Sequence, residues 1–256
     1  MNRALLEVEG LHHWFGGLHV IDGVDLSCPE GVVKAVIGPN GAGKSTLFHL
    51  IGGALRPRTG SIRVGGKETA GLPSHRMARL GVARTFQSSR LFPGMSVLDN
   101  VLVGLHVRGR SGFLADALLP SSARSEERAL RARALEALER LGIAELAQAD
   151  AAGLPFGRQR IVEIARALAP KPRLLLLDEP ACGLNNSETA DLAERIRAIR
   201  AGGVTVLLVE HDMSLVMEVA DQIAVLHYGR KIADGTPREI QADPDVISVY
   251  LGAADA

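Results

Sequence analysis

Aromatic residues and cysteines are scarce in this sequence, and neither sign of charge is in excess. Phe, Tyr and Trp make up 4% of its 256 residues, and 29 basic side chains are balanced by 29 acidic ones. This balance argues against a nucleic-acid partner, because affinity for phosphate backbones rests on clustered cations. Two cysteines, Cys28 and Cys182, cannot form a disulfide framework or, by themselves, a structural zinc site. We therefore expect a reduced, cytosolic setting.

Long apolar runs are lacking as well. No stretch approaches the roughly 18 to 20 apolar residues that a helix needs to cross a bilayer. The first apolar patch is interrupted by Glu7 and Glu9, which is not typical of a signal peptide. Any link to a membrane is expected to come through a partner. Hydrophobic residues nevertheless make up 46% of the chain, which excludes a disordered protein and provides for a sizeable core.

The hydrophobic pattern predicts an α/β fold, because short apolar runs alternate with helical segments. Runs that are apolar on both faces suit a parallel sheet covered by helices on each side. The expected strands are residues 32–37, 174–177, 204–209 and 223–226. The expected helices are residues 44–52, 160–168, 188–201 and 214–220.

The middle of the chain differs, since no strand pattern stands out between about residues 96 and 148. Residues 126–141 predict a helix, and residues 108–124, with several Gly, Pro and Ser, predict a long connection. The apolar stripe of the helix consists of Leu130, Ala134, Leu138 and Leu141. We interpret residues 1–256 as one domain, with a helical subdomain inserted at about 87–154 and a helical tail at about 237–256.

The segment GPNGAGKST, residues 38–46, matches a phosphate-binding loop between a predicted strand and a predicted helix. Glycines allow backbone N–H groups to point at phosphate oxygens, and the helix N-terminus adds its dipole. Lys44 is placed to reach the β- and γ-phosphates, and Ser45 offers a hydroxyl to Mg²⁺. The alternative is an ordinary glycine-rich turn. The motif indicates phosphate, but not which nucleotide.

The run RLLLLDEP, residues 173–180, predicts a buried strand with two carboxylates at its C-terminal edge, where parallel sheets bind ligands. Asp178 would hold Mg²⁺ directly or through water, and Glu179 would polarise the attacking water as a general base. Read alone, the same residues are also compatible with a solvated strand end followed by a turn at Pro180.

Two further candidates gain weight only from their order along the chain. His211 follows a predicted strand and could contact the γ-phosphate, although a lone histidine is more often structural. Gln87 follows Thr85 and Phe86, a place where a glutamine is usually a surface residue.

In this order the motifs resemble those of the ATP-binding subunits of ABC transporters, over essentially the whole chain. The ordered set is Phe15 (aromatic loop), residues 38–46 (Walker A), Gln87 (Q-loop), LPFGRQR at 154–160 (signature), LLLLDEP (Walker B), residues 183–185 (D-loop) and His211 (H-switch). The signature, placed just before IVEIARAL, is close to diagnostic. The resemblance implies a P-loop NTPase fold, that is, an ABC-type nucleotide-binding domain with a RecA-like core, a small antiparallel β subdomain and an inserted helical subdomain.

The resemblance also implies a site for ATP and Mg²⁺. Phe15, rather than the adjacent Trp14, would stack on adenine. Catalytic roles would fall to Glu179, His211, Lys44 and Gln87, and Mg²⁺ would be held by Ser45, Gln87 and Asp178. The residues expected at the nucleotide are Phe15, Gly38, Pro39, Asn40, Gly41, Ala42, Gly43, Lys44, Ser45 and Thr46, with Leu154, Gly157, Arg158 and Gln159 contacting the ATP of a partner subunit.

The match narrows to the ATPase of branched-chain amino-acid importers, through GVARTFQSSRLFPGMSVLDNV, DEPACGLN, VEHDM and the tail GTPREIQADPDVISVYLG. That family pairs two ATPase subunits, often different paralogues, beneath two membrane permeases that a solute-binding protein supplies. The resemblance thus implies a peripheral protein at the cytoplasmic face of the inner (plasma) membrane. A urea or amide importer, a lipopolysaccharide exporter and, less favoured, a soluble non-transport ABC ATPase are the alternatives.

The signature departs from the family's usual LSGGQ. Pro155 replaces the serine, Phe156 a glycine and Arg158 the first glutamine, while the D-loop carries Asn185 where the family usually has Asp. Pro155 has neither a hydroxyl nor an N–H, so two donors to the partner's γ-phosphate are missing. Arg158 either compensates through a charge-assisted contact or points into solvent.

Overall fold

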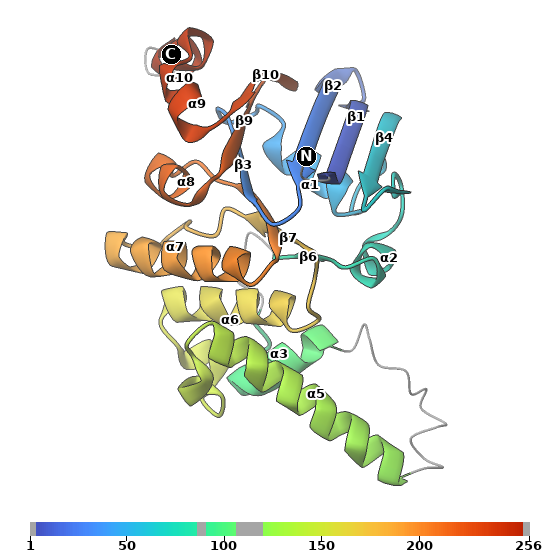
Figure 1. Ribbon diagram of the computed structural model, residues 1–256, viewed down its shortest axis with the longest axis vertical. Coiled ribbons are helices and arrows are strands. Elements are labelled where there is room, and N and C mark those ends of the chain that lie inside the picture. Colours follow the sequence, from blue (N-terminus) through green and yellow to red (C-terminus); the bar gives the residue numbers. More distant parts are fainter. Residues whose placement is uncertain (1–3, 86–90, 106–119, 253–256) are drawn as a thin grey trace. The chain divides into compact units, whose positions relative to one another are not determined.

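The computed structural model describes residues 4–85, 91–105 and 120–252 (Figure 1). The chain forms two compact units, of which the first combines Met1–Arg84 with Arg173–Ala256 and the second is Thr85–Pro172. The boundary expected for the insert, about 87–154, ends earlier than this second unit. The reason is that α6 (Phe156–Leu168) packs against α3 (Val97–Leu105) and α5 (Pro120–Arg140), which belong to the same unit.

The first unit is built on a six-stranded sheet in the order β10-β9-β3-β8-β7-β6. Its strands are β10 (Arg230–Gly235), β9 (Gln222–His227), β3 (Val33–Ile37), β8 (Thr205–Val209), β7 (Leu174–Asp178) and β6 (Val82–Arg84). Neighbours from β9 to β6 pair in parallel, and β10 joins the edge antiparallel to β9. The four strands predicted from apolar runs are confirmed, whereas β6 and β10 were not predicted.

Helices of the first unit pack against both faces of this sheet (Figure 1). Along β3, Val36 joins the core beneath α1 (Lys44–Ile51), while Ala35 and Ile37 face α8 (Met213–Val219) and α9 (Pro237–Ala242). Helix α7 (Asn186–Ala201) packs beside α8, and α10 (Pro244–Gly252) ends the described chain. The predicted helices are confirmed, although α6 begins at Phe156 rather than at residue 160.

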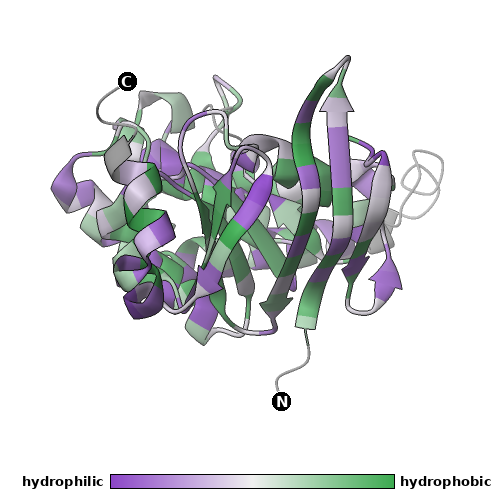
Figure 2. Ribbon diagram, turned by 90° about the horizontal axis from the view of Figure 1, so that it is seen from above, coloured by the Kyte–Doolittle hydropathy of each residue, from purple (hydrophilic) through white to green (hydrophobic). Residues whose placement is uncertain are grey.

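A second sheet in the same unit is antiparallel and has the order β2-β1-β4-β5. Its strands are β1 (Ala4–Phe15), β2 (Leu18–Pro29), β4 (Thr59–Val64) and β5 (Lys67–Glu68), and α2 (Ser74–Arg79) follows them. The two long strands alternate between hydrophobic and hydrophilic residues (Figure 2). One row, which includes Leu6, Val8 and Leu26, therefore joins the core that α1 shares with the parallel sheet. The expected small antiparallel β subdomain is confirmed.

The second unit is helical in its described residues, with two short 3₁₀ turns, η2 (Ala144–Leu146) and η3 (Ala151–Gly153), between α5 and α6. The prediction of a connection over 108–124 is wrong for its last five residues, because Pro120 takes the first position of α5, where proline is favoured. Residues 106–119 lie outside the described part. Of the predicted stripe, Ala134, Leu138 and Leu141 are buried and Leu130 is half-buried.

Candidate nucleotide site

The phosphate loop joins the end of β3 to the start of α1, as its motif requires. Gly38, Gly41 and Gly43 have φ values of 149°, 81° and 101°. A Cβ at Gly38 would lie 2.1 Å from the main-chain oxygen of Leu226, and one at Gly43 would lie 2.6 Å from that of Val20. Glycine is therefore required at both positions. No side chain caps α1 at Gly43, so its first N–H groups suit an anion.

Lys44 lies over the loop that precedes it. Its Nζ donates hydrogen bonds to the main-chain oxygens of Gly38, at 2.6 Å, and Pro39, at 3.0 Å. Burial lowers the pKa of the Lys44 ammonium, while the negative charge of Glu179 raises it. Ser45 is exposed and Thr46 half-buried, and of the remaining loop residues Pro39 is half-buried, Asn40 and Gly41 are exposed, and Ala42 is buried. The lysine is thus held where phosphate groups would meet the loop.

Asp178 ends β7 and is almost fully buried, with 3% of its side chain exposed. Its Oδ2 accepts a hydrogen bond of 2.7 Å from Nη2 of Arg84 at the end of β6. Sequence reasoning did not identify Arg84. The signal available was a cation directly after the apolar residues Val82 and Ala83 and just before Thr85.

Glu179 follows directly and adopts a left-handed backbone with φ of 45°, which is unusual for a residue with a Cβ. Its N–H donates to the main-chain oxygen of Val209 at 2.9 Å, which fixes the turn to the end of β8. The negative charge of Glu179 acts on Lys44 of the phosphate loop, where it raises the pKa of the ammonium.

His211 lies just beyond β8, with 59% of its side chain exposed. Its Nδ1 is 3.8 Å from Oε2 of the preceding residue, Glu210. Because β3, β8 and β7 are parallel neighbours, their carboxyl ends lie at one edge of the sheet. The structure therefore brings Lys44, Asp178, Glu179 and His211 to the same edge of the first unit.

Phe15 and Trp14 end β1 in different surroundings. The Phe15 ring is 51% exposed and meets the buried His13 edge-on, with ring centroids 4.7 Å apart. The half-buried Trp14 ring stacks on His19 at 5.3 Å and carries the Arg58 guanidinium at 5.7 Å. Phe15 thus presents the more accessible aromatic surface of the pair, whereas the Trp14 ring already has His19 and Arg58 as partners.

The signature segment lies in the second unit, where it leads into α6. Pro155 is the N-cap residue of this helix and provides no side-chain cap. Gln159 Nε2 donates to the main-chain oxygens of Ala152, at 3.1 Å, and Leu154, at 2.9 Å. Arg158 is exposed and Gly157 buried. Gln87, the other site residue expected near this unit, lies outside the described residues.

Asn185 has a structural role that the sequence did not reveal. It is the N-cap of α7, and its Oδ1 accepts from the N–H of Glu188 at 3.0 Å. Glu188 Oε2 accepts in return from the N–H of Asn185, also at 3.0 Å. This capping box stabilises the start of the helix. Asn185 therefore contributes to the stability of the single chain, independently of any partner subunit.

The residues present fit ATP and Mg²⁺. At Gly41 nothing lies within 4 Å of the place where a Cβ would be, so the backbone there is open to a phosphate, and the Ser45 hydroxyl and the Asp178 carboxylate are the hard oxygen donors that Mg²⁺ prefers. Among the described residues, no cluster of three or more His, Cys, Asp or Glu could hold a metal by itself. A few protein oxygens completed by phosphate and water are typical of Mg²⁺.

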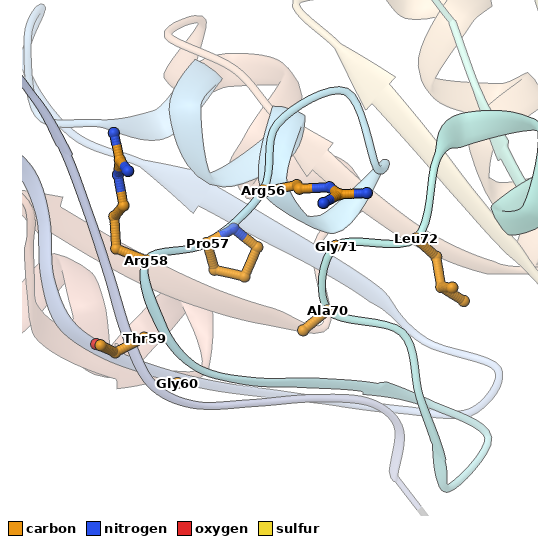
Figure 3. A pocket seen from close by; sticks show the side chains of 8 residues that line it. All are labelled: Arg56, Pro57, Arg58, Thr59, Gly60, Ala70, Gly71 and Leu72. Atoms are coloured by element: carbon orange, nitrogen blue, oxygen red, sulfur yellow. The ribbon is translucent and has the colours of Figure 1, made fainter.

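A separate cavity of about 470 Å³ opens in the first unit (Figure 3). It lies between the start of β4 and the segment after β5, and is lined by Arg56, Pro57, Arg58, Thr59, Gly60, Ala70, Gly71 and Leu72. None of the expected site residues lines it, so we do not assign it to nucleotide binding.

The sequence matches family profiles of ATP-binding transport proteins, in agreement with the geometry of the site. The ABC transporter profile matches residues 21–182, and the profile of the branched-chain amino acid ATP-binding cassette transporter matches residues 230–256. The high-affinity branched-chain amino acid transport ATP-binding protein BraF of Pseudomonas aeruginosa is 47% identical, over 99% of this chain and 100% of its own. The corresponding protein of Escherichia coli K12 is 44% identical over 99% and 100%.

A solved structure of an ATP-binding cassette has the same fold as this chain. The ADP conformation of an ATP-binding cassette of an ABC transporter superposes with a TM-score of 0.85 at 30% identity, covering 98% of this chain and 99% of that one. Among the described residues, we find no helix long and apolar enough to cross a bilayer. The expected ABC-type fold is confirmed, and the chain belongs to the ABC transporter family, within its branch of branched-chain amino acid transport ATP-binding proteins.

Proposed function

We propose that the chain hydrolyses ATP to power an importer of branched-chain amino acids. The observation that carries the proposal is the meeting of Lys44, Asp178, Glu179 and His211 at one edge of the parallel sheet. Similarity over the full length of two branched-chain amino acid transport ATP-binding proteins, together with the match at residues 230–256, supports branched-chain amino acids as the transported solutes.

In the proposed mechanism the backbone of residues 38–43 and the Lys44 ammonium bind the β- and γ-phosphates. Glu179 accepts a proton at its carboxylate from the attacking water, and His211 orients that water and the γ-phosphate through its ring N–H. Ser45 and Asp178, with Gln87, would hold Mg²⁺, which when bound neutralises phosphate charge. Catalysis is then mainly positioning and charge stabilisation by groups that the fold already holds in place.

The proposal includes a second ATPase subunit and two permeases. Each ATP would lie between the phosphate loop of one subunit and the signature of the other, so that closure depends on nucleotide contacts that hydrolysis removes. The chain would then lie at the cytoplasmic face of the inner membrane through its permeases. Exposed Phe156 and Arg158 would face the nucleotide of the partner subunit.

The test is purification of the tagged chain from membranes of its own organism, followed by reconstitution of the complex that co-purifies into proteoliposomes. Leucine, isoleucine and valine uptake should depend on ATP and on the solute-binding protein. Uptake of urea or short amides alone would contradict the proposed substrate, branched-chain amino acids. Recovery of lipopolysaccharide-export components would contradict the proposal that the transporter is an importer. If no membrane protein accompanies the chain, the transport role is wrong.

A further inference from the structure

Glu210 is a fully buried carboxylate at the end of β8, with 0% of its side chain exposed. Oε1 accepts the N–H of Ala181 at 2.7 Å, and Oε2 accepts the N–H groups of His211 at 3.0 Å and Asp212 at 3.3 Å. Burial raises the pKa of the Glu210 carboxyl, and these three N–H donors lower it. A carboxylate at this depth requires such donors, because burying a charge is costly.

The two oxygens reach two different turns. Ala181 comes two residues after Glu179, while the other two donors belong to the turn that carries His211. The ladder between β7 and β8 ends at the pair Asp178 and Val209, and one main-chain bond, from the Glu179 N–H to the Val209 oxygen, continues it. Beyond this point the Glu210 side chain takes over from the backbone as the tie between the two strand ends.

A carboxylate suits these three donors, since it accepts at both oxygens and carries no hydrogen that would need a buried acceptor of its own. Glutamine at position 210 would turn its NH₂ group toward one set of N–H groups and leave that set unpaired. An aliphatic residue would leave three buried donors without an acceptor. A buried charge contributes little to stability. We therefore infer that the carboxylate at position 210 serves to hold the two turns in place.

We propose that Glu210 is a positioning residue for ATP hydrolysis, which ties the His211 turn to the turn after Glu179 and so fixes the separation of base and imidazole. The inference rests on the hydrolytic function proposed above. Glu210 does not touch the nucleotide, so its effect passes through the two residues that do. Misplacement of a reacting group by about 1 Å costs on the order of 100-fold in rate, and an effect of that size is expected in kcat.

The experiment uses the assembled transporter carrying Glu210→Gln or Glu210→Asp, with Glu218→Gln as the matched control. Glu218 is exposed on α8 and paired with Arg197 at 2.7 Å. The position 210 variants should lower kcat about 10- to 100-fold, with the KM and Kd for ATP within about twofold and the thermal midpoint lowered by only a few degrees, so that the protein stays folded at the assay temperature. The control should leave all of these quantities unchanged.

A second pair of variants separates positioning from stability. In a His211→Ala background, Glu210→Gln should cause little further loss of kcat, because the imidazole that it positions is already gone. An equal fold-loss in both backgrounds, or a loss of kcat that matches a fall in folded protein, overturns the inference, as does failure of both position 210 variants to fold. If the wild-type complex does not hydrolyse ATP, the proposed function fails instead.

Discussion

The Arg84 guanidinium and the Asp178 carboxylate lie 2.7 Å apart, Nη2 to Oδ2, at the ends of the parallel neighbours β6 and β7. The strand register pairs Arg84 with Leu176, so its side chain extends forward along β7 to reach the carboxylate two residues on. The carboxylate that we assign to Mg²⁺ is therefore held by a cation of the chain itself.

Arg84→Ala should destabilise the fold by about 3 kcal/mol, because removal of one member of a buried ion pair is strongly destabilising. Urea unfolding measures this change. The double variant with Asp178→Asn should recover part of the loss, since the charge is then gone as well. Arg197→Ala, whose pair with Glu218 is 44% exposed on each side, should cost less than about 1 kcal/mol. Equal losses for Arg84→Ala and Arg197→Ala would contradict the assignment.

Glu179→Gln keeps the shape of the side chain but removes the basic carboxylate. ATP should bind to the variant with nearly wild-type affinity, while turnover of the assembled transporter falls by orders of magnitude. Fluorescent-nucleotide titration and phosphate release measure the two quantities. Near-normal hydrolysis by the variant complex would show that another group activates the water.

Phe15→Ala should weaken ATP and GTP alike, by about 1–3 kcal/mol, because stacking on an aromatic ring tolerates any base. Trp14→Ala should leave both affinities nearly unchanged, since that ring is engaged by His19 and Arg58. Calorimetric titration of the two variants with both nucleotides provides the comparison. If only Trp14→Ala weakens binding, the assigned register of the aromatic loop is wrong.

Pro155 should make the two ATP sites of a heteromeric transporter unequal, because in the proposed dimer this chain's signature would serve the nucleotide of its partner. The site that uses Lys44 and Glu179 should perform most of the hydrolysis, as blocking each Walker B glutamate in turn would show. Pro155→Ser adds an N-cap hydroxyl to α6, which should raise stability by about 1 kcal/mol and increase turnover at the partner's site. Equal loss from both blocked glutamates, or a functional homodimer, would remove the asymmetry.

Burial raises the pKa of the Cys28 thiol from 9.0 to about 12. Above pH 9.0 the unfolded chain loses this proton while the folded chain keeps it, so the free energy of unfolding should fall as pH rises from 9.0 towards 12. Cys28→Ala should make that decline shallower. At neutral pH a thiol-specific chromogenic reagent should label Cys182, which is exposed, and reach Cys28 only after unfolding. Rapid labelling of both cysteines in the folded protein would contradict this.

The parallel strands were predictable because each is a continuous apolar run, as in the four leucines before Asp178. The edge strand β6 was missed because three residues carry too short a pattern. Side-chain roles were likewise predictable only where a local sequence pattern indicates them. Lys44, Asp178, Glu179 and His211 lie in motifs, whereas the roles of Arg84 and Glu210 arise from partners 94 and 29 residues away.

Glu179 keeps its carboxylate on a backbone that suits glycine better. Its φ of 45° costs a residue with a Cβ about 1–3 kcal/mol, and glycine would adopt the same turn without that cost. Selection for heat resistance alone would therefore favour glycine at this position, and under the proposed mechanism the resulting chain would be more stable but unable to hydrolyse ATP. If Glu179 is the proposed general base, a glutamate in this conformation persists only while turnover itself is selected, so its loss among paralogues should mark subunits that no longer hydrolyse ATP.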